Sequence, residues 1–233
     1  MGHLIPEQKF SNLWSKDLTI PVPALDIVIF TIYRGEVCVI LLKMENGKDG
    51  VVYTLPGGII AAGYSLEDNF DSILERKTGI TGVYKEQIYT FGNPSRDKRG
   101  HTLSVVYLAL LGIDKFLSQV DFTKVEIVKY NEIDKIKLGF DHLDIIKYTK
   151  QRLRWKMEYT NIAKDILSDE FRISQLQEVY EIVLGKTIDK RNFQKKIFKL
   201  NMIKETGNLD KTTNRPAKLY SFVDKQIKIY EVI

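Results

Sequence analysis

One stretch with glycines at both ends, LPGGIIAAGYSLEDNFDSILERKTGI (55–80), constrains the fold more than any other part of this chain. The Gly57-Gly58 pair predicts a turn, and residues 65–68 resemble a capping box that starts a helix over 66–78. Gly79 stands where a glycine is expected after the last turn of a helix. The stretch therefore predicts a tight glycine turn, a short spacer and one well-capped helix.

Apolar runs rich in β-branched residues lie on both sides of this stretch. LDIVIFTIY (25–33) and EVCVILLKM (36–44) are joined by Arg34-Gly35, which predicts a β-hairpin. QIYTFGN (87–93) and LSVVYLALLGI (103–113) predict two further strands, separated by the loop PSRDKRG (94–100). The order strand, strand, helix, strand, strand indicates a mixed α/β sandwich. Residues 142–167 contain no Gly or Pro and predict a helical connector, with Leu143, Ile146, Leu153 and Met157 facing the core.

The last third of the chain has the pattern of a winged helix-turn-helix. A capping box over 174–177 and a helical apolar stripe predict a first helix that ends at Gly185. The stripe consists of Leu176, Val179, Tyr180 and Val183. Asp189 is placed to cap a second helix, KRNFQKKIFKL (190–200), with Phe193, Ile197 and Leu200 buried. A strand over 202–206, a polar loop over 207–215 and a strand over 216–223 predict the hairpin of the wing.

Charge is unevenly distributed along the chain. Residues 151–233 hold 17 Lys and Arg against 11 Asp and Glu, which leaves 18 against 19 in residues 1–150. This asymmetry suggests that the C-terminal third meets a polyanion, although a solvated Lys-rich surface would have the same composition.

Cys38 is the one cysteine of the chain, so an intrachain disulfide and a cysteine-based metal cluster are both excluded. No apolar run approaches the ~20 residues that cross a bilayer, and the N-terminus lacks a signal-peptide pattern, so we expect a cytoplasmic protein without a membrane partner.

From Gly58 onward, the glycine stretch resembles a Nudix box. The frame ends correctly at Gly79 and Ile80, with Leu74 at the inner apolar position. The first Glu of the family box is replaced by Tyr64, its Arg-Glu pair by Ser72-Ile73 and its Glu-Glu pair by Arg76-Lys77. Mg²⁺ prefers hard oxygen ligands, and Arg and Lys have no acceptor to offer it. The resemblance therefore implies a Nudix fold without a metal, a cofactor or catalytic activity.

The remaining acids of the helix do not restore this site in the predicted geometry. Glu67, Asp71 and Glu75 lie at i, i+4 and i+8, so they share one helix face. That face lies nearly opposite Ile73, Arg76 and Lys77. A solvated acidic face is the expected role of the three carboxylates.

The loop 94–100 resembles a segment of Nudix domains that bind ADP-ribose-like ligands. We expect Arg96, Asp97, Arg99 and Tyr64 to contact an effector, because guanidinium groups suit both phosphate and sugar hydroxyls. An exposed hairpin loop with ordinary charges is the alternative. His101 is expected to be structural or exposed, and His3 and His142 are too isolated to predict a metal site.

The second helix of the last third is the candidate DNA-reading element. Residues 186–218 contain ten Lys and Arg against three acids. Arg, Gln and Asn can read base edges in the major groove, while Lys contacts phosphates. The candidates on the helix are Lys190, Arg191, Asn192, Gln194, Lys195 and Lys196, and those on the wing are Lys211, Arg215 and Lys218. A winged-helix module that binds another protein through a solvated basic face is the alternative.

Five segments resemble, in the same order, the Nudix-related transcriptional regulators of the NrtR and AraR type. They are FDHLDII (140–146), QRLRWKMEYT (151–160), FRISQLQEVYEIVLG (171–185), DKRNFQKKI (189–197) and NRPAKLYSF (214–222). The resemblance implies the α/β class, with a Nudix-like mixed-sheet α/β/α sandwich followed by a winged helix-turn-helix. The implied boundaries are an N-terminal extension 1–23, an effector-binding domain 24–141, a helical connector 142–167 and a DNA-binding domain 168–233.

The same resemblance implies a ligand-responsive repressor that acts as a homodimer on a palindromic double-stranded operator. Its small-molecule effector would be an ADP-ribose-like nucleotide or a sugar such as arabinose. Two alternative functions remain compatible with the sequence. One is a Nudix hydrolase of nucleoside diphosphate derivatives with an atypical metal site, and the other is a protein-interaction scaffold.

Overall fold

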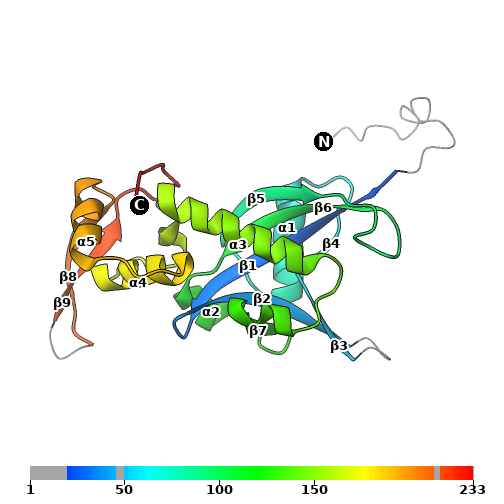
Figure 1. Cartoon of the computed structure of the whole chain (residues 1–233), viewed down its shortest axis with the longest axis horizontal. Helices are drawn as coiled ribbons and strands as arrows, with labels where there is room; N and C mark the ends of the chain where they lie inside the picture. Colours follow the sequence, from blue (N-terminus) through cyan, green and yellow to red (C-terminus); the bar gives the residue numbers. More distant parts are fainter. Residues whose placement is uncertain (1–19, 46–49, 213–215, 233) are drawn as a thin grey trace.

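The structure, a computed structural model, describes residues 20–45, 50–212 and 216–232. Within these ranges seven strands form one mixed sheet, and a two-stranded hairpin lies at the far end of the molecule (Figure 1). The sheet order is β3-β2-β1-β6-β5, with β4 paired to β1 and β7 paired to β2. The strands are β1 (Val22–Tyr33), β2 (Glu36–Glu45), β3 (Val51–Thr54), β4 (Gly57–Ile59), β5 (Tyr84–Phe91), β6 (Thr102–Leu110) and β7 (Val125–Lys129).

The predicted hairpin of β1 and β2 is confirmed. Arg34 and Gly35 both have positive φ, at 52° and 76°. Two-residue hairpin turns require positive φ at these positions, because only then does the turn match the twist of the two strands. The two strands pair antiparallel from Ile29 opposite Ile40 to Tyr33 opposite Glu36. β6 lies on the other side of β1 and is parallel to it, so the sheet is mixed as expected.

The Gly57-Gly58 pair was expected to form a turn, and this expectation is wrong. Both glycines belong to β4, which pairs antiparallel with β1 so that Gly57 lies opposite Asp26. A Cβ on Gly57 would overlap the Asp26 carboxylate and lie 2.7 Å from the Leu25 carbonyl oxygen. Glycine is needed here because two strands and a side chain approach one another closely.

Helices cover both faces of the sheet. α1 (Leu66–Thr78) and α2 (Ile113–Gln119) pack on the face that carries Ile27 and Ile29. α3 (His142–Tyr159) packs on the opposite face, which carries Val28 and Phe30. Alternate residues of β1 therefore enter two separate cores, as the two-residue period of a strand dictates. This is the α/β/α sandwich that the sequence predicts.

The caps of α1 agree with the sequence in detail. The Asp68 backbone N–H donates to Ser65 Oγ at 3.0 Å, and the Ser65 backbone N–H donates to Asp68 Oδ2 at 3.2 Å. Gly79 follows in the left-handed conformation with φ of 76°. The capping box and the C-terminal glycine are both confirmed.

The predicted connector is a layer of the sandwich as well as a link. Ile146, Leu153 and Met157 of α3 are buried as expected, and Leu143 is partly buried. α3 runs along the sheet and continues to the winged helix, where the short turn η4 (Ile162–Asp165) follows it (Figure 1). One continuous apolar core extends from the sheet through α3 into the last third of the chain.

The last third forms the predicted helix, helix and hairpin. The elements are α4 (Ile173–Leu184), α5 (Lys190–Lys199), β8 (Ile203–Asp210) and β9 (Ala217–Phe222). The predicted apolar stripe of α4 is fully buried, and Gly185 ends the helix with φ of 67°. Phe193 and Ile197 of α5 are buried, whereas Leu200 is only partly buried.

Two local expectations in this third are wrong. α4 begins before Ser174, because Gln175 Oε1 accepts the Arg172 backbone N–H at 2.8 Å and thereby starts the helix at Ile173. The loop expected over 207–215 is shorter, because β8 continues to Asp210 opposite Ala217. Gly207, with φ of 85°, lies within the irregular part of this ladder, so the glycine accommodates a bulge and the strand continues.

After β9 the chain returns to the end of α3. Asn161 Nδ2 donates to the carbonyls of Asp224 and Gln226, and its Oδ1 accepts the Lys228 backbone N–H at 2.8 Å. We call these contacts of Asn161 the clasp. The chain therefore enters and leaves the winged helix at the same place. Among the described residues, no helix is both long enough and apolar enough to span a bilayer.

Candidate functional site

A cavity of about 680 Å³ opens at one end of the sandwich, between β1, β4, the loop 94–100 and the start of α3. Three of the four expected effector contacts, Arg96, Asp97 and Arg99, line it. Its size lies in the range of small-molecule sites. The structure thus brings the loop that the sequence singled out to a cavity, together with residues from β1 and α3.

Arg96 anchors the wall of this cavity and is itself buried. Its guanidinium donates to both Asp141 carboxylate oxygens at 3.0 and 2.8 Å, and to Asp26 Oδ2 at 3.2 Å. It also donates to Thr102 Oγ1 at 2.9 Å. A fork of this kind suits bidentate pairing with a carboxylate. Arg96 therefore ties β1 to Asp141, which precedes α3, and its donors face protein groups in this structure.

His142, the first residue of α3, lies at the back of the same cavity. It is 3% exposed, and its Nδ1 accepts the Leu55 backbone N–H at 3.0 Å. Its Nε2 lies 3.7 Å from Asp26 Oδ1. Burial lowers the pKa of His142 below its usual value, against the opposing pull of Asp26. The imidazole is thus held in the neutral form, as its acceptor role at Nδ1 requires.

Arg99 is the exposed arginine of the loop. Its side chain is 78% exposed and pairs with Asp97 at 2.8 Å, while Asp97 itself is buried. The guanidinium also lies 5.1 Å from the centre of the Phe140 ring. The hydrogen bonds from Arg99 lower the pKa of the Asp97 carboxyl. Arg99 is therefore a preoriented cation at the rim of the cavity, next to an exposed aromatic face.

The positions that replace the Nudix carboxylates lie in different environments. Tyr64 is 68% exposed and does not line the cavity, although the sequence placed it there as an effector contact. Ile73 is buried in the core below α1, and Lys77 lines the cavity. Burial, followed by repulsion from Arg76, lowers the pKa of Lys77. The wall of the cavity on the α1 side thus carries a cation.

The three acids on the other face of α1 are held elsewhere or exposed. Glu67 Oε1 accepts from the Tyr107 hydroxyl at 3.1 Å, and Asp71 pairs with Lys85 at 2.6 Å. Glu75 is exposed. None of the three lines the cavity. Within the described ranges, no three His, Cys, Asp or Glu side chains are grouped so as to hold a metal ion.

The candidate DNA-reading helix projects its basic side chains away from the core. Asp189 Oδ1 accepts the Asn192 backbone N–H at 2.8 Å, which confirms the predicted N-cap of α5. Lys190, Arg191, Asn192 and Lys195 are exposed, and Gln194 and Lys196 are partly exposed. The expected contact residues therefore share an accessible helix surface, in the geometry of a helix that enters a groove.

On the wing, Lys211 and Lys218 are exposed. Lys218 pairs across the hairpin with Glu205 at 3.0 Å, so it is partly neutralised in this state. Arg215 lies outside the described residues. The wing contact therefore stays a prediction for all three cations.

Comparison with known proteins agrees with this arrangement in both halves. Residues 163–222 match the family model of the NrtR DNA-binding winged helix domain. An ADPR responsive transcriptional repressor, NtrR of Acinetobacter baylyi, is 30% identical over 222 residues, which is 93% of this chain and 88% of the relative. The chain belongs to the NrtR family of transcriptional regulators.

Two solved structures extend the comparison to the three-dimensional level. Shewanella oneidensis NrtR in complex with a 27mer DNA is 32% identical, with a TM-score of 0.77 over 85% of this chain and 92% of that one. The Nudix domain of the same NrtR in complex with ADP ribose is 29% identical, with a TM-score of 0.51 over 63% of this chain and 98% of that one. The fold predicted from sequence, a Nudix-like sandwich joined to a winged helix, is thus confirmed for this NrtR-family chain.

Sequence reasoning did not identify the residues that hold the cavity wall of this NrtR-family protein. Asp26, Asp141 and Thr102 fix Arg96, and His142 was set aside as isolated. One signal was present in the sequence, since Asp26 is a single acid inside the apolar run LDIVIF. A charged residue in a buried strand needs a partner, but the sequence does not say which.

Proposed function

We propose that this protein is a cytoplasmic transcriptional repressor that binds operator DNA and releases it on binding ADP-ribose. The observation that carries the proposal is the match over 93% of the chain to an ADPR responsive repressor, which includes both the sandwich and the winged helix. The basic surface of α5 and the cavity beside Arg99 supply the two sites that such a function needs. ADP-ribose is favoured over a sugar because the related Nudix domain was solved with ADP ribose.

The proposed assembly is a homodimer on a palindromic operator. Two winged helices related by a twofold axis match two half-sites of the same sequence. Ligand binding can alter DNA affinity only if ADP-ribose binds one dimer geometry better than another. α3 is suited to this coupling, because Asp141 before its first residue binds Arg96 in the cavity and its far end meets the winged helix.

We also propose that the sandwich does not hydrolyse its ligand. The positions of the Nudix carboxylates hold Tyr64, Ile73, Arg76 and Lys77, and the last of these brings a cation to the cavity. A cation there would repel Mg²⁺. Incubation with ADP-ribose and Mg²⁺ should release no phosphate-containing product, and turnover above a buffer control would contradict this part of the proposal.

Fluorescence anisotropy with duplex DNA tests the DNA-binding function. DNA from the upstream region of the chain's own operon, together with a genomic-fragment pool, would be titrated at several salt concentrations. Arg191→Ala/Lys195→Ala should weaken binding roughly tenfold or more and reduce the salt dependence, because two cations that contact DNA are lost. Lys43→Ala/Lys124→Ala removes the same charge from the sandwich and should leave affinity unchanged.

The same assay then tests the effector. ADP-ribose should release the DNA, whereas arabinose should not. Absence of selective binding to both the upstream DNA and the genomic pool would contradict the repressor. Selective binding that ADP-ribose leaves unchanged would retain the DNA-binding function and remove the proposed effector.

A further inference from the structure

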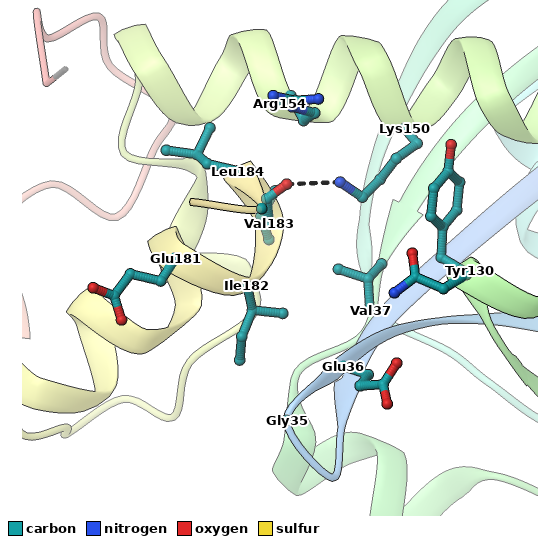
Figure 2. Close-up of a pocket in the computed structure, with 12 residues that line it drawn as sticks. Gly35, Glu36, Val37, Tyr130, Lys150, Arg154, Glu181, Ile182, Val183 and Leu184 are labelled. Atoms are coloured by element: carbon teal, nitrogen blue, oxygen red, sulfur yellow. Dashed lines mark hydrogen bonds between the residues drawn. The ribbon is translucent and has the colours of Figure 1, made fainter. Parts of the chain in front are cut away.

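A second cavity, of about 450 Å³, lies where the sandwich meets the winged helix (Figure 2). Its walls are the turn between β1 and β2, the start of η3 (Tyr130–Lys135), the middle of α3 and the C-terminal end of α4. None of its lining residues lines the cavity that holds Arg96 and Arg99. We call it the junction cavity. An occupant would contact both parts of the protein at once.

Lys150 of α3 reaches into the junction cavity with almost no exposure. The residue is 7% exposed, and its Nζ donates to the Val183 carbonyl oxygen at 2.7 Å (Figure 2). The ammonium also lies 5.4 Å from the centre of the Tyr130 ring. Within the described ranges, Lys150 forms no ion pair with a carboxylate. A buried ammonium has three donors and is costly without a counterion, so an anion bound next to Lys150 would stabilise it.

Arg154 adds a second positive charge one turn further along α3. Residues 150 and 154 share one helix face because they are four positions apart. Arg154 is exposed, lines the cavity and forms no ion pair among the described residues. Burial, followed by repulsion from Arg154, lowers the pKa of Lys150 to about 8. Lys150 is therefore still mostly protonated at neutral pH.

The two carboxylates that line the junction cavity are engaged elsewhere. Glu36 pairs with Lys129 at 2.7 Å. Glu181 accepts the Ile188 backbone N–H at 2.8 Å and the Gln177 side-chain amide at 3.1 Å. Neither neutralises Lys150 or Arg154 in this arrangement. The junction cavity thus combines space, two uncompensated cations and the face of one aromatic ring.

We propose that the junction cavity binds a small phosphorylated metabolite, with Lys150 and Arg154 holding its phosphate. Lys150 would act as a point charge and Arg154 as a planar fork, the two ways in which proteins hold phosphate. Tyr130, Val37 and Ile182 offer apolar surface to the rest of the ligand. Binding would draw Lys150 away from the carbonyl of Val183, the next-to-last residue of α4, and so adjust the winged helix independently of ADP-ribose.

Isothermal titration of the full chain with inorganic pyrophosphate, at constant ionic strength, tests this site. The variants are Arg154→Gln, which alters an exposed side chain, and Lys150→Met, which keeps the length of the buried stem. Each should weaken the cavity component of binding roughly tenfold, the usual effect of losing one charge-assisted hydrogen bond. Lys147→Met is the matched control, because Lys147 lies on the same helix but pairs with Asp134 outside the cavity.

The outcomes separate this site from other cationic surfaces. The proposal is supported if Arg154→Gln and Lys150→Met each lose one component of pyrophosphate binding. Lys147→Met and Arg191→Ala/Lys195→Ala should retain that component. Pyrophosphate binding that Arg154→Gln leaves unchanged, or no binding at millimolar pyrophosphate, would overturn it. Arg154→Gln decides the matter if Lys150→Met fails to fold. The result does not depend on whether ADP-ribose binds the other cavity.

Discussion

Arg96 and Arg99 are three residues apart and line the same cavity, but they have opposite roles in its geometry. Arg96 is buried and directs its donors to Asp26, Asp141 and Thr102, so it shapes the wall. Arg99 is exposed above the Phe140 ring, so its guanidinium is accessible at the rim of the cavity. The sequence identified both arginines as contacts but could not separate them, because Asp141 and Asp26 lie 45 and 70 residues away along the chain.

Gly57→Ala should destabilise the protein by about 1–3 kcal/mol, the usual cost of forcing extra atoms into a packed site. The new methyl group would collide with the Asp26 carboxylate and the Leu25 carbonyl, and so disturb the partner of Arg96. Gly100→Ala is the control, because a Cβ there meets nothing within 4 Å. Denaturant unfolding of both variants measures the effect. Equal unfolding midpoints would contradict the prediction and show that β4 shifts to accommodate the methyl group.

His142 should make the protein less stable in mild acid. Its folded pKa lies below the usual 6.5, so below pH 6.5 the unfolded chain binds a proton that the folded chain resists. The free energy of unfolding should therefore decrease as the pH is lowered, by up to about 1.4 kcal/mol between pH 7.5 and pH 5.5. Asp26, Asp141 and Arg96 face the same imidazole. These three residues are present both in the wild type and in the His142→Asn variant with which it is compared.

His142→Asn is the comparison protein, because its amide oxygen can accept the Leu55 N–H without titrating. Urea unfolding at pH 7.5 and pH 5.5 should show a smaller loss of stability in this variant than in the wild type. Identical losses would mean that His142 is not the group responsible.

Helices and turns could be predicted from sequence wherever residues close together in the chain determine the conformation. The caps of α1, the two-residue turn between β1 and β2 and the stripe of α4 were all predictable from neighbours in sequence. β3, β4 and β7 were not predicted. They are short, and they form because β1 or β2 offers a free edge, which is information from distant residues.

Asp189→Ala should destabilise the protein by about 1 kcal/mol, because the Asn192 N–H at the start of α5 loses its acceptor. DNA affinity should fall as well, since Lys190 and Arg191 occupy the first turn that would fray. Asp189→Asn keeps an acceptor and should restore most of both properties. Thermal melting and anisotropy would be measured on the same samples. A loss of stability without a loss of DNA affinity would contradict the second part of this prediction.

At the scale of the whole molecule, the sequence predicted the two-part architecture but not the contacts between the parts. A helical connector was expected over 142–167, whereas α3 also forms one layer of the sandwich and one wall of the junction cavity. The depth of Lys150 could not be foreseen, because a lysine at any helical position has the same sequence signal. Its burial depends on where α4 packs.

ADP-ribose and operator DNA should weaken each other's binding by the same factor. This reciprocity follows from linkage for any two ligands that favour different conformations of one protein. Saturating ADP-ribose, at about 100 times its Kd, should also stabilise the free protein by about 2.7 kcal/mol. Calorimetric titration of ADP-ribose with and without DNA, compared with anisotropy with and without ADP-ribose, gives the two factors. Unequal factors would show that the ligands do not act on one shared equilibrium.

The clasp at Asn161 has a mechanical consequence. The incoming chain at the end of α3 and the outgoing chain at Asp224, Gln226 and Lys228 are fastened together, so both ends of the winged helix are held at the same place. The junction cavity is lined by the C-terminal end of α4. α5 and the hairpin of β8 and β9 lie at the end of the molecule away from the sandwich (Figure 1). A rotation of the winged helix about the clasp would move α5 farther than it moves Asn161, because α5 lies farther from the axis of such a rotation. The candidate DNA-reading helix would then change its position without loss of the hydrogen bonds of Asn161.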